Sequence, residues 1–401
     1  MNESVDKTVR EAEALAHLAA IVGAGHTRFG VLDEGPRALV RSAVELAFAS
    51  VDRGAERKDV AEAFLATLGF GGAQIGNSAA LLGEEAGVVG VPVTRVENAC
   101  ASGGFALRSA VGALSSRASP LVLVVGVEKM TDVSNARRRY WLGVSGDTEW
   151  ERLAGLTFAG VYGLIASRYF AEHGNASEAL AEVAVKNHEN GALNPNAHFQ
   201  KRVSRADVLA APRVADPLGL YDCCPVSDGA VAILLSPPEL AHRYTDSPVY
   251  VDGLGAGTDY LALQERDTIT SFRATQRAAH EAFRSAGWHR SDVSFLEVHD
   301  CFTIAELLAL EDLGFAGPGE AAALTVSGAT RRDGRLPVNP DGGLKAKGHP
   351  IGASGVSQVY EVFLQLRGEA GSRQVDHAGH ALAHNVGGAG ATAAVSLFSV
   401  G

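Results

Sequence analysis

The chain has 401 residues, of which 46% are hydrophobic and 20% charged, and its formal net charge is −11 at pH 7. This composition is typical of a folded globular protein, and the length is sufficient for two domains or for a duplicated one. The acidic balance argues against nucleic acid as the main ligand, because binding phosphates usually requires a basic surface. No apolar run approaches the length needed to cross a bilayer, so no membrane association is expected.

The cysteine content points to a reducing compartment. Four cysteines are too few for a disulfide scaffold, and no Cys/His spacing resembles a zinc site, so we expect reduced thiols and no metal. Residues 1–18 are charged and lack the apolar core of a signal peptide. These features predict a cytoplasmic protein.

The first predicted element is a buried strand over residues 17–25 that runs into a glycine turn. Residues 248–255 have the same pattern, and glycine-led apolar runs follow at 228–235 and 390–397. Because the second half of the chain repeats the markers of the first, the sequence predicts an internal duplication.

Helix-like stretches at 38–51 and 274–286 alternate with short apolar runs at 121–127 and 293–298. This alternation predicts α/β layers with mainly parallel strands inside. Residues 132–215 lack a strong strand pattern and are richer in Arg, Asn and His, which suggests an insertion that forms a substrate pocket.

The predicted chain therefore has three parts. Residues 1–131 and 216–245 form an N-terminal half, residues 132–215 an inserted loop domain, and residues 246–401 a C-terminal half.

The first candidate for chemistry is Cys100, which lies in the run NACASG where an extended segment ends and small residues open a predicted helix. The amide dipoles at a helix N-terminus favour a thiolate over a thiol. A nucleophile and a buried cysteine that acts as a small hydrophobe are both compatible with this pattern.

The second candidate is His349, held between Gly348 and Pro350 in the run GHPIGASG. An imidazole is the usual partner that activates a thiol, although a turn histidine bonded to the backbone fits the local pattern equally well. The loop lacks the spacing of a phosphate-binding P-loop.

The third candidate is the HDCF run, in which His299 and Cys301 lie two residues apart and would point the same way from an extended segment. If the halves are duplicated, this junction matches that of Cys100. The structural alternative is that His299 is satisfied within the core and Cys301 fills space.

The fourth candidate is the run AHNVGGAG, in which His384 precedes a glycine turn. Free amides at Gly387 and Gly388 could receive a developing oxyanion. His384 could instead cap that turn.

These four stretches, in this order and at these separations, resemble the thiolase superfamily over nearly the whole chain. The run GHPIGASG after GGLKAKG is highly specific. The HD-x-F segment, in place of the usual NEAF, is similar to the sterol-carrier/lipid-transfer branch and to archaeal-type acetyl-CoA acetyltransferases. The resemblance implies an α/β thiolase fold, in which duplicated αβα halves form a five-layer αβαβα core with an inserted loop domain.

The resemblance also implies an acetyl-CoA C-acetyltransferase that condenses and thiolyses 3-ketoacyl-CoA by a ping-pong mechanism. Cys100 would hold the acyl group while His349 takes the thiol proton. His299 would position a water or donate to the oxyanion of the second substrate, and the amides around Gly387 and Gly388 would receive the oxyanion of the acyl-enzyme.

One feature departs from the family pattern. Most thiolases have a second catalytic cysteine in a C-x-G motif near the C-terminus, and we assign His384 to that place. The transfer of the α-proton then falls to Cys301, with His384 and His349 as alternatives. Ser354 and Asn385, which lie in the same two motifs, are expected to bind substrate.

The expected ligands follow from the same resemblance. Coenzyme A would be substrate and product, with no bound cofactor, and the chain would form a homodimer or tetramer. Archaeal-type relatives often act beside a small zinc-containing OB-fold protein, which would be a separate chain here. The alternatives are a ketoacyl synthase-like or retro-aldol enzyme of the same branch, another related acyltransferase, or a non-catalytic acyl-CoA- or lipid-binding subunit.

Overall fold

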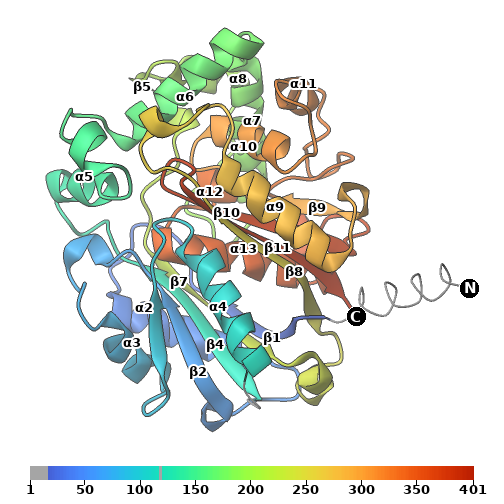
Figure 1. Ribbon diagram of the computed structural model, residues 1–401. Coiled ribbons are helices and arrows are strands. Elements are labelled where there is room, and N and C mark those ends of the chain that lie inside the picture. Colours follow the sequence, from blue (N-terminus) through green and yellow to red (C-terminus); the bar gives the residue numbers. More distant parts are fainter. Residues whose placement is uncertain (1–16, 117–119) are drawn as a thin grey trace, which may run out of the picture.

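The computed structural model describes residues 17–116 and 120–401 (Figure 1). Residues 1–16, which make up most of the segment where the sequence predicts no signal peptide, lie outside the described residues. Within the described part of the chain, no helix combines the length and the apolar character that a bilayer span requires.

A large mixed sheet organises the molecule, with the strand order β3-β2-β4-β7-β1-β8-β11-β10-β9. Its first part consists of β1 (Ala19–His26), β2 (Val60–Ala66), β3 (Val93–Val96), β4 (Leu121–Glu128) and β7 (Gly229–Ser236). Its second part consists of β8 (Val249–Thr258), β9 (Phe295–Glu297), β10 (His380–Gly387) and β11 (Thr392–Val400).

The two parts of this sheet repeat one pairing scheme. In the first part, β2 pairs in parallel with β4, which is antiparallel to β7, which is antiparallel to β1. In the second part, β9, β10, β11 and β8 follow with the same directions. Antiparallel pairing of β1 with β8 joins the two parts. The repeat agrees with the predicted duplication, whereas the predicted domain boundaries stay a prediction.

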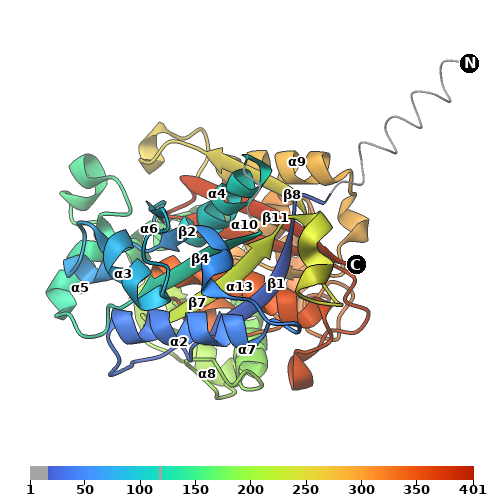
Figure 2. The same ribbon diagram turned by 90° about the horizontal axis from the view of Figure 1, so that it is seen from below.

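Helices cover the outer face of each part of the sheet, and further helices fill the space between the inner faces of the two parts. α2 (Pro36–Ala49) packs on β1 and β7, and α9 (Arg273–Ala286) packs on β8 and β11. α4 (Ser102–Ser116) and α13 (Ile351–Leu366) pack against each other and against strands of both parts. Figure 2 shows α13 between α2 and α9. The layers therefore run helix, sheet, helix, sheet, helix, as the thiolase fold requires.

The remaining helices lie around this core. The region from 132 to 215 is mainly helical and contains α5 (Asn135–Gly143), α6 (Phe158–His173), α7 (Ser177–Gly191), α8 (Arg205–Leu209) and the short strand β5 (Arg213–Ala215), which pairs with β6 (Leu218–Gly219). Elsewhere are α3 (Ser78–Ala86), α10 (Thr303–Asp312), α11 (Ala321–Val326) and α12 (Gly343–Ala346).

Glycines bring the outer helices into contact with the sheet. A Cβ at Gly25 of β1 would lie 2.3 Å from the carbonyl oxygen of Ala43 in α2, and one at Gly255 of β8 would lie 1.8 Å from that of Ala278 in α9. The expected glycine turn after residue 22 is therefore wrong. These glycines lie inside the strands because a backbone-to-backbone approach leaves no room for a side chain.

The expectation of mainly parallel strands is also wrong. β2 is parallel to β3 and β4, and β9 to β10, but the other neighbours in the large sheet are antiparallel. Every residue of β4 and β7 is buried. A strand that is covered by helices on both faces has a continuous apolar sequence. Such strands are common in parallel sheets, but here the apolar runs result from burial between helix layers and not from parallel pairing.

Candidate active site

Cys100 and His349 stand at equivalent places, each two residues before a central helix begins. The two helices cross where Gly103 of α4 meets Gly355 of α13, and a Cβ at Gly103 would lie 2.8 Å from the Cα of Gly355. Because both crossing residues lack side chains, the N-terminal ends of the helices come close together. The two motifs identified in the sequence thereby meet in space.

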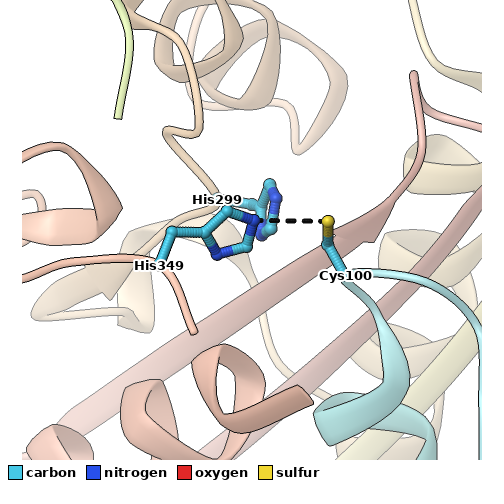
Figure 3. Close-up of side chains that lie close together, drawn as sticks. All are labelled: Cys100, His299 and His349. Carbon is cyan, nitrogen blue, oxygen red and sulfur yellow. Dashed lines mark hydrogen bonds between the residues drawn. The ribbon is translucent and has the colours of Figure 1, made fainter. Parts of the chain in front are cut away.

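The thiol of Cys100 lies against the imidazole of His349, with 3.2 Å between Sγ and Nε2 (Figure 3). Nδ1 of His349 is 2.6 Å from Oγ of Ser354, and that hydroxyl donates to the carbonyl oxygen of Pro350 at 2.8 Å. Since the Ser354 proton is used there, Nδ1 of the neutral ring carries the hydrogen and Nε2 offers its lone pair to the thiol. This arrangement is that of a nucleophile with its general base.

Both members of the pair are uncharged at neutral pH. Burial raises the pKa of Cys100 to about 12, although the backbone N–H of Gly388 opposes this. Burial, together with the charge of Lys347, lowers the pKa of His349 to about 3. A neutral pair requires the proton to move to His349 when the sulfur attacks, rather than beforehand.

His299 presents an unused hydrogen-bond donor beside this pair (Figure 3). Its Nδ1 lies 3.2 Å from the amide nitrogen of Asn385, which can only donate, so Nδ1 is the acceptor and the proton is on Nε2. That Nε2 is buried and has no hydrogen-bond partner among the described residues. The His299 ring stands 5.2 Å from the His349 ring at an angle of 83°. A buried N–H of this kind is suited to a substrate oxygen.

Asn385 fixes the positions of three groups around the thiol. Its amide nitrogen donates to the carbonyl oxygen of Cys100 at 2.9 Å as well as to His299, and its Oδ1 accepts from the backbone N–H of Gly104 at 3.0 Å. The structure thus places Asn385 behind Cys100 and His299, and the fully buried Ser354 behind His349, where each orients its neighbour.

Cys301 lines the same cavity of about 200 Å³ as Cys100 and His349. Burial raises the pKa of Cys301 well above its ordinary value, so it rests as a thiol. The neighbouring Tyr162 hydroxyl donates its single proton to the carbonyl oxygen of Gly388 at 3.2 Å. The sequence analysis missed Tyr162, because a single buried tyrosine in α6 has no motif around it.

The glycine turn after β10 approaches Cys100 closely. Gly388 has a φ of +62°, a value that favours glycine, and its backbone N–H lowers the pKa of Cys100. A Cβ at Gly387 would lie 2.4 Å from the carbonyl oxygen of Asn98. The two glycines named from the sequence therefore lie close to Cys100.

A buried carboxylate holds the loops around the cavity. Glu128, at the end of β4, accepts hydrogen bonds from the backbone N–H groups of Leu68 at 2.8 Å, Phe70 at 2.7 Å and Gly352 at 3.2 Å. The first two belong to the loop after β2, and Gly352 lies in the first turn of α13. Nothing in the sequence pattern alone indicated this role.

The comparisons with known proteins agree with this geometry. The family model described as the thiolase N-terminal domain matches residues 19–239, and the one described as thiolase C-terminal domain-like matches residues 255–400. The chain belongs to the thiolase family. It is an acyltransferase of the thiolase type, as the resemblance of its motifs predicted.

Its relatives identify the branch. An acetyl-CoA acetyltransferase of Methanothermobacter thermautotrophicus is 44% identical over 382 residues, which cover 95% of this chain and 99% of that protein. Human sterol carrier protein 2 is 34% identical over 327 residues, covering 79% of this chain and 60% of that protein. The branch predicted from the HD-x-F segment is confirmed.

Solved structures share the thiolase fold. A structure titled Ltp2-ChsH2(DUF35) aldolase superposes with a TM-score of 0.84 at 24% identity, over 96% of this chain and 99% of that one. The acetyl-CoA acetyltransferase of Syntrophomonas wolfei gives a TM-score of 0.72 at 18% identity, over 96% of this chain and 99% of that one.

Within this thiolase, the place of the C-terminal catalytic cysteine needs correcting. A C-x-G motif that ends at Gly387 begins at position 385, so Asn385, rather than His384, occupies it. Adjacent strand residues face opposite sides of a sheet, and His384 accordingly points away, with Nε2 2.9 Å from Oγ1 of Thr275 on α9. His384 does not line the catalytic cavity.

The expected match between the Cys100 and Cys301 junctions is wrong as well. Cys301 follows β9, whose counterpart in the first part of the sheet is β2. Cys100 precedes α4, whose counterpart is α13. The duplication therefore relates Cys100 to His349.

The thiolase centre also has the spacing of a metal site, since Sγ of Cys100 and ring nitrogens of His299 and His349 lie within 4.8 Å of one another. The observed hydrogen bonds suit a metal poorly. His299 carries its proton on Nε2, the nitrogen without a hydrogen-bond partner among the described residues, and His349 already accepts from the thiol. A metal would require both nitrogens and the sulfur to be unprotonated.

Proposed function

We propose that this thiolase is an acetyl-CoA C-acetyltransferase that reversibly cleaves and forms 3-ketoacyl-CoA through an acyl-enzyme on Cys100. The observation that carries the proposal is the 3.2 Å contact between Sγ of Cys100 and Nε2 of His349, with Nδ1 held by Ser354. The acetyl-CoA acetyltransferases at 44% and 40% identity over 95% of the chain support acetoacetyl-CoA as the substrate.

The first half-reaction of the cleavage begins with Cys100 and Cys301 both in the neutral thiol form. Sγ of Cys100 bonds to the 3-keto carbon of acetoacetyl-CoA while its proton passes to Nε2 of His349. The oxyanion formed at the keto oxygen lies near the N–H of Gly388. The C2–C3 bond then breaks, leaving an acetyl group on Cys100 and the enolate of acetyl-CoA.

The enolate is the group that needs His299 and Cys301. The enolate oxygen accepts from Nε2–H of His299, and C2 takes the proton of the Cys301 thiol, which releases acetyl-CoA. In the second half, coenzyme A gives its thiol proton to the Cys301 thiolate and attacks the acetyl group. Cys100 leaves and recovers its proton from His349, so both thiols return to their starting state.

The decisive experiment mixes the purified protein with acetoacetyl-CoA and coenzyme A and measures acetyl-CoA formation. In parallel, acetyl-CoA alone is added and the intact protein is weighed, followed by peptide mapping. We expect turnover and an acetyl group on Cys100. Absence of cleavage together with an unmodified Cys100 would contradict the proposal and favour a non-catalytic acyl-CoA-binding role.

Association with other chains is a separate proposal. We propose a homodimer or tetramer, and a separate small zinc-containing OB-fold protein as partner, because the resemblance to the family implies both. A structure with a DUF35 component in its title has the same fold, which supports a partner of the DUF35 type. Light scattering of the purified chain, and of the chain with candidate partners, tests both. A cytoplasmic location stays a prediction.

A further inference from the structure

A second cavity lies against the catalytic one. It has a volume of about 320 Å³, and the segment Cys223, Cys224 and Pro225 forms a wall of both cavities. A water molecule occupies about 30 Å³ of the liquid, so the second cavity has room for roughly ten non-hydrogen atoms. The second cavity is therefore the space that adjoins the Cys100 cavity on the far side of this segment.

The ammonium group of Lys345 lines the second cavity without a carboxylate partner. Its side chain is 2% exposed, and its Nζ lies 5.9 Å and 5.8 Å from the ring centres of Phe199 and Tyr221. The only hydrogen bond of Nζ among the described residues is to Nε2 of His188, at 3.3 Å. A buried charge normally has an oppositely charged partner.

The other buried lysines of the described chain have such partners. Lys129 pairs with Asp228 at 2.8 Å, Lys186 with Glu306 at 2.9 Å, and Lys347 with Asp341. Lys345 thus differs from them in its charge environment although it is equally buried.

His188 cannot neutralise Lys345. Burial and the nearby charge of Lys345 lower the pKa of His188 to about 4, so the ring is neutral at neutral pH. Its Nδ1 donates to the carbonyl oxygen of Lys201 at 3.0 Å, which leaves Nε2 as the acceptor for the ammonium.

Two carboxyl groups near Lys345, those of Asp222 and Asp300, accept hydrogen bonds from other groups. Asp222 accepts from the hydroxyl of Thr303 at 2.6 Å and from the backbone N–H of Gly219 at 2.7 Å. Asp300 accepts from the backbone N–H groups of Leu344 and Lys345 at 2.6 Å and 3.2 Å, and from the side-chain amide of Asn187 at 2.7 Å. The charge of Lys345 therefore remains available to a ligand in the cavity.

We propose that the second cavity binds the far end of an acyl chain that terminates in a carboxylate, with Nζ of Lys345 as the carboxylate ligand. This inference rests on the proposed thiolase function and extends it to 3-ketoacyl-CoA derived from dicarboxylic acids. The rings of Phe199 and Tyr221 contact the methylene groups. One ammonium in apolar walls matches the single charge of a carboxylate rather than the double charge of a phosphate.

Binding to the Cys100→Ala variant tests this without requiring turnover. Calorimetry would compare adipyl-CoA with hexanoyl-CoA, and suberyl-CoA with octanoyl-CoA, because the members of each pair have equal length. A hydrogen bond to a charged group is worth about 1.5–3 kcal/mol, so we expect the carboxylate-ended ligand to bind about 10- to 100-fold more tightly in at least one pair.

The Lys345→Met substitution in the same background should abolish that preference, since methionine is also unbranched and removes the charge. Lys201→Met is the matched control. Lys201 lines the same cavity but is exposed, so solvent screening should leave most of the preference intact.

Two outcomes overturn the inference: no preference for the carboxylate in either pair, or a preference that survives Lys345→Met. If the methionine variant does not fold, the comparison of ligands in Cys100→Ala alone decides. Cleavage of acetoacetyl-CoA by the wild-type protein is measured separately, so a failure of the proposed function is distinguishable from a failure of this site.

Discussion

The two halves of the sheet have the same strand order but contribute different chemistry. In the first half the residue two positions before the central helix is Cys100, and in the second half it is His349. The crossing of α4 and α13 at Gly103 and Gly355 brings these equivalent positions within hydrogen-bond distance. The duplication therefore supplies a site that neither half contains by itself.

The halves also differ in what surrounds that pair. The second half adds His299 and Cys301 after β9 and Asn385 on β10, which together supply the donors and the second thiol. The first half adds Glu128, whose carboxylate holds backbone amides in place. In the proposed mechanism the first half thus carries the nucleophile, whereas proton transfer depends on the second.

The largest expected effect on the rate of thiolysis comes from replacing Cys100, in the first half of the chain. Cys100→Ala should reduce thiolysis by more than about 10⁴-fold, because no other group can carry the acyl chain. Alanine is smaller than cysteine, so the fold should persist, which thermal unfolding checks. If Cys100→Ala kept more than a few per cent of the wild-type rate, the assignment of the nucleophile would be wrong.

The corresponding change in the second half is His349→Asn, which should slow acetylation of Cys100 by about 10²–10⁴-fold. In the wild type, His349 is neutral above its pKa of about 3 and Cys100 is protonated below its pKa of about 12, so the two groups leave acetylation independent of pH between these values.

Without the base, acetylation in this variant should instead rise with pH as the thiolate fraction grows. Rapid quenching followed by intact-mass measurement gives both profiles. An inflection near the ordinary histidine pKa of about 6.5 in the wild type would contradict the neutral pair.

The next test separates the two thiols. Cys301→Ala should lower thiolysis by about 10²–10⁴-fold, while acetyl-CoA alone should still acetylate Cys100. His384→Ala should keep turnover and lose about 1 kcal/mol of unfolding free energy with its bond to Thr275. If the Cys301 variant turns over normally and the His384 variant acetylates but stalls, the proton transfer belongs to His384.

The smallest expected effect on acetylation comes from replacing Ser354, which holds the imidazole of His349. Ser354→Ala removes the acceptor that keeps the proton of His349 on Nδ1, so the ring can adopt the tautomer that cannot accept from the thiol. A net hydrogen bond of about 1.4 kcal/mol corresponds to about a tenfold lower rate of acetylation. A change in the KM for acyl-CoA with kcat unaffected would instead support direct substrate binding by Ser354.

The sequence determined those features that depend on local patterns. Continuous apolar runs predicted the buried strands β4, β7 and β11, and small residues after Cys100 predicted the start of α4. The motifs around Cys100 and His349 were sufficient for the family and for the nucleophile and base as candidates. These properties lie within a few consecutive residues, so no tertiary contact is needed to recognise them.

The tertiary structure decided which candidates meet. Neighbours in β10 face opposite layers, which places Asn385 at the thiol and His384 on α9. Strand direction, the position of Tyr162 and the unpaired charge of Lys345 likewise depend on elements far apart in the chain. Packing between layers determines all three features. The linear pattern of apolar and polar residues does not show which layer packs against a given face.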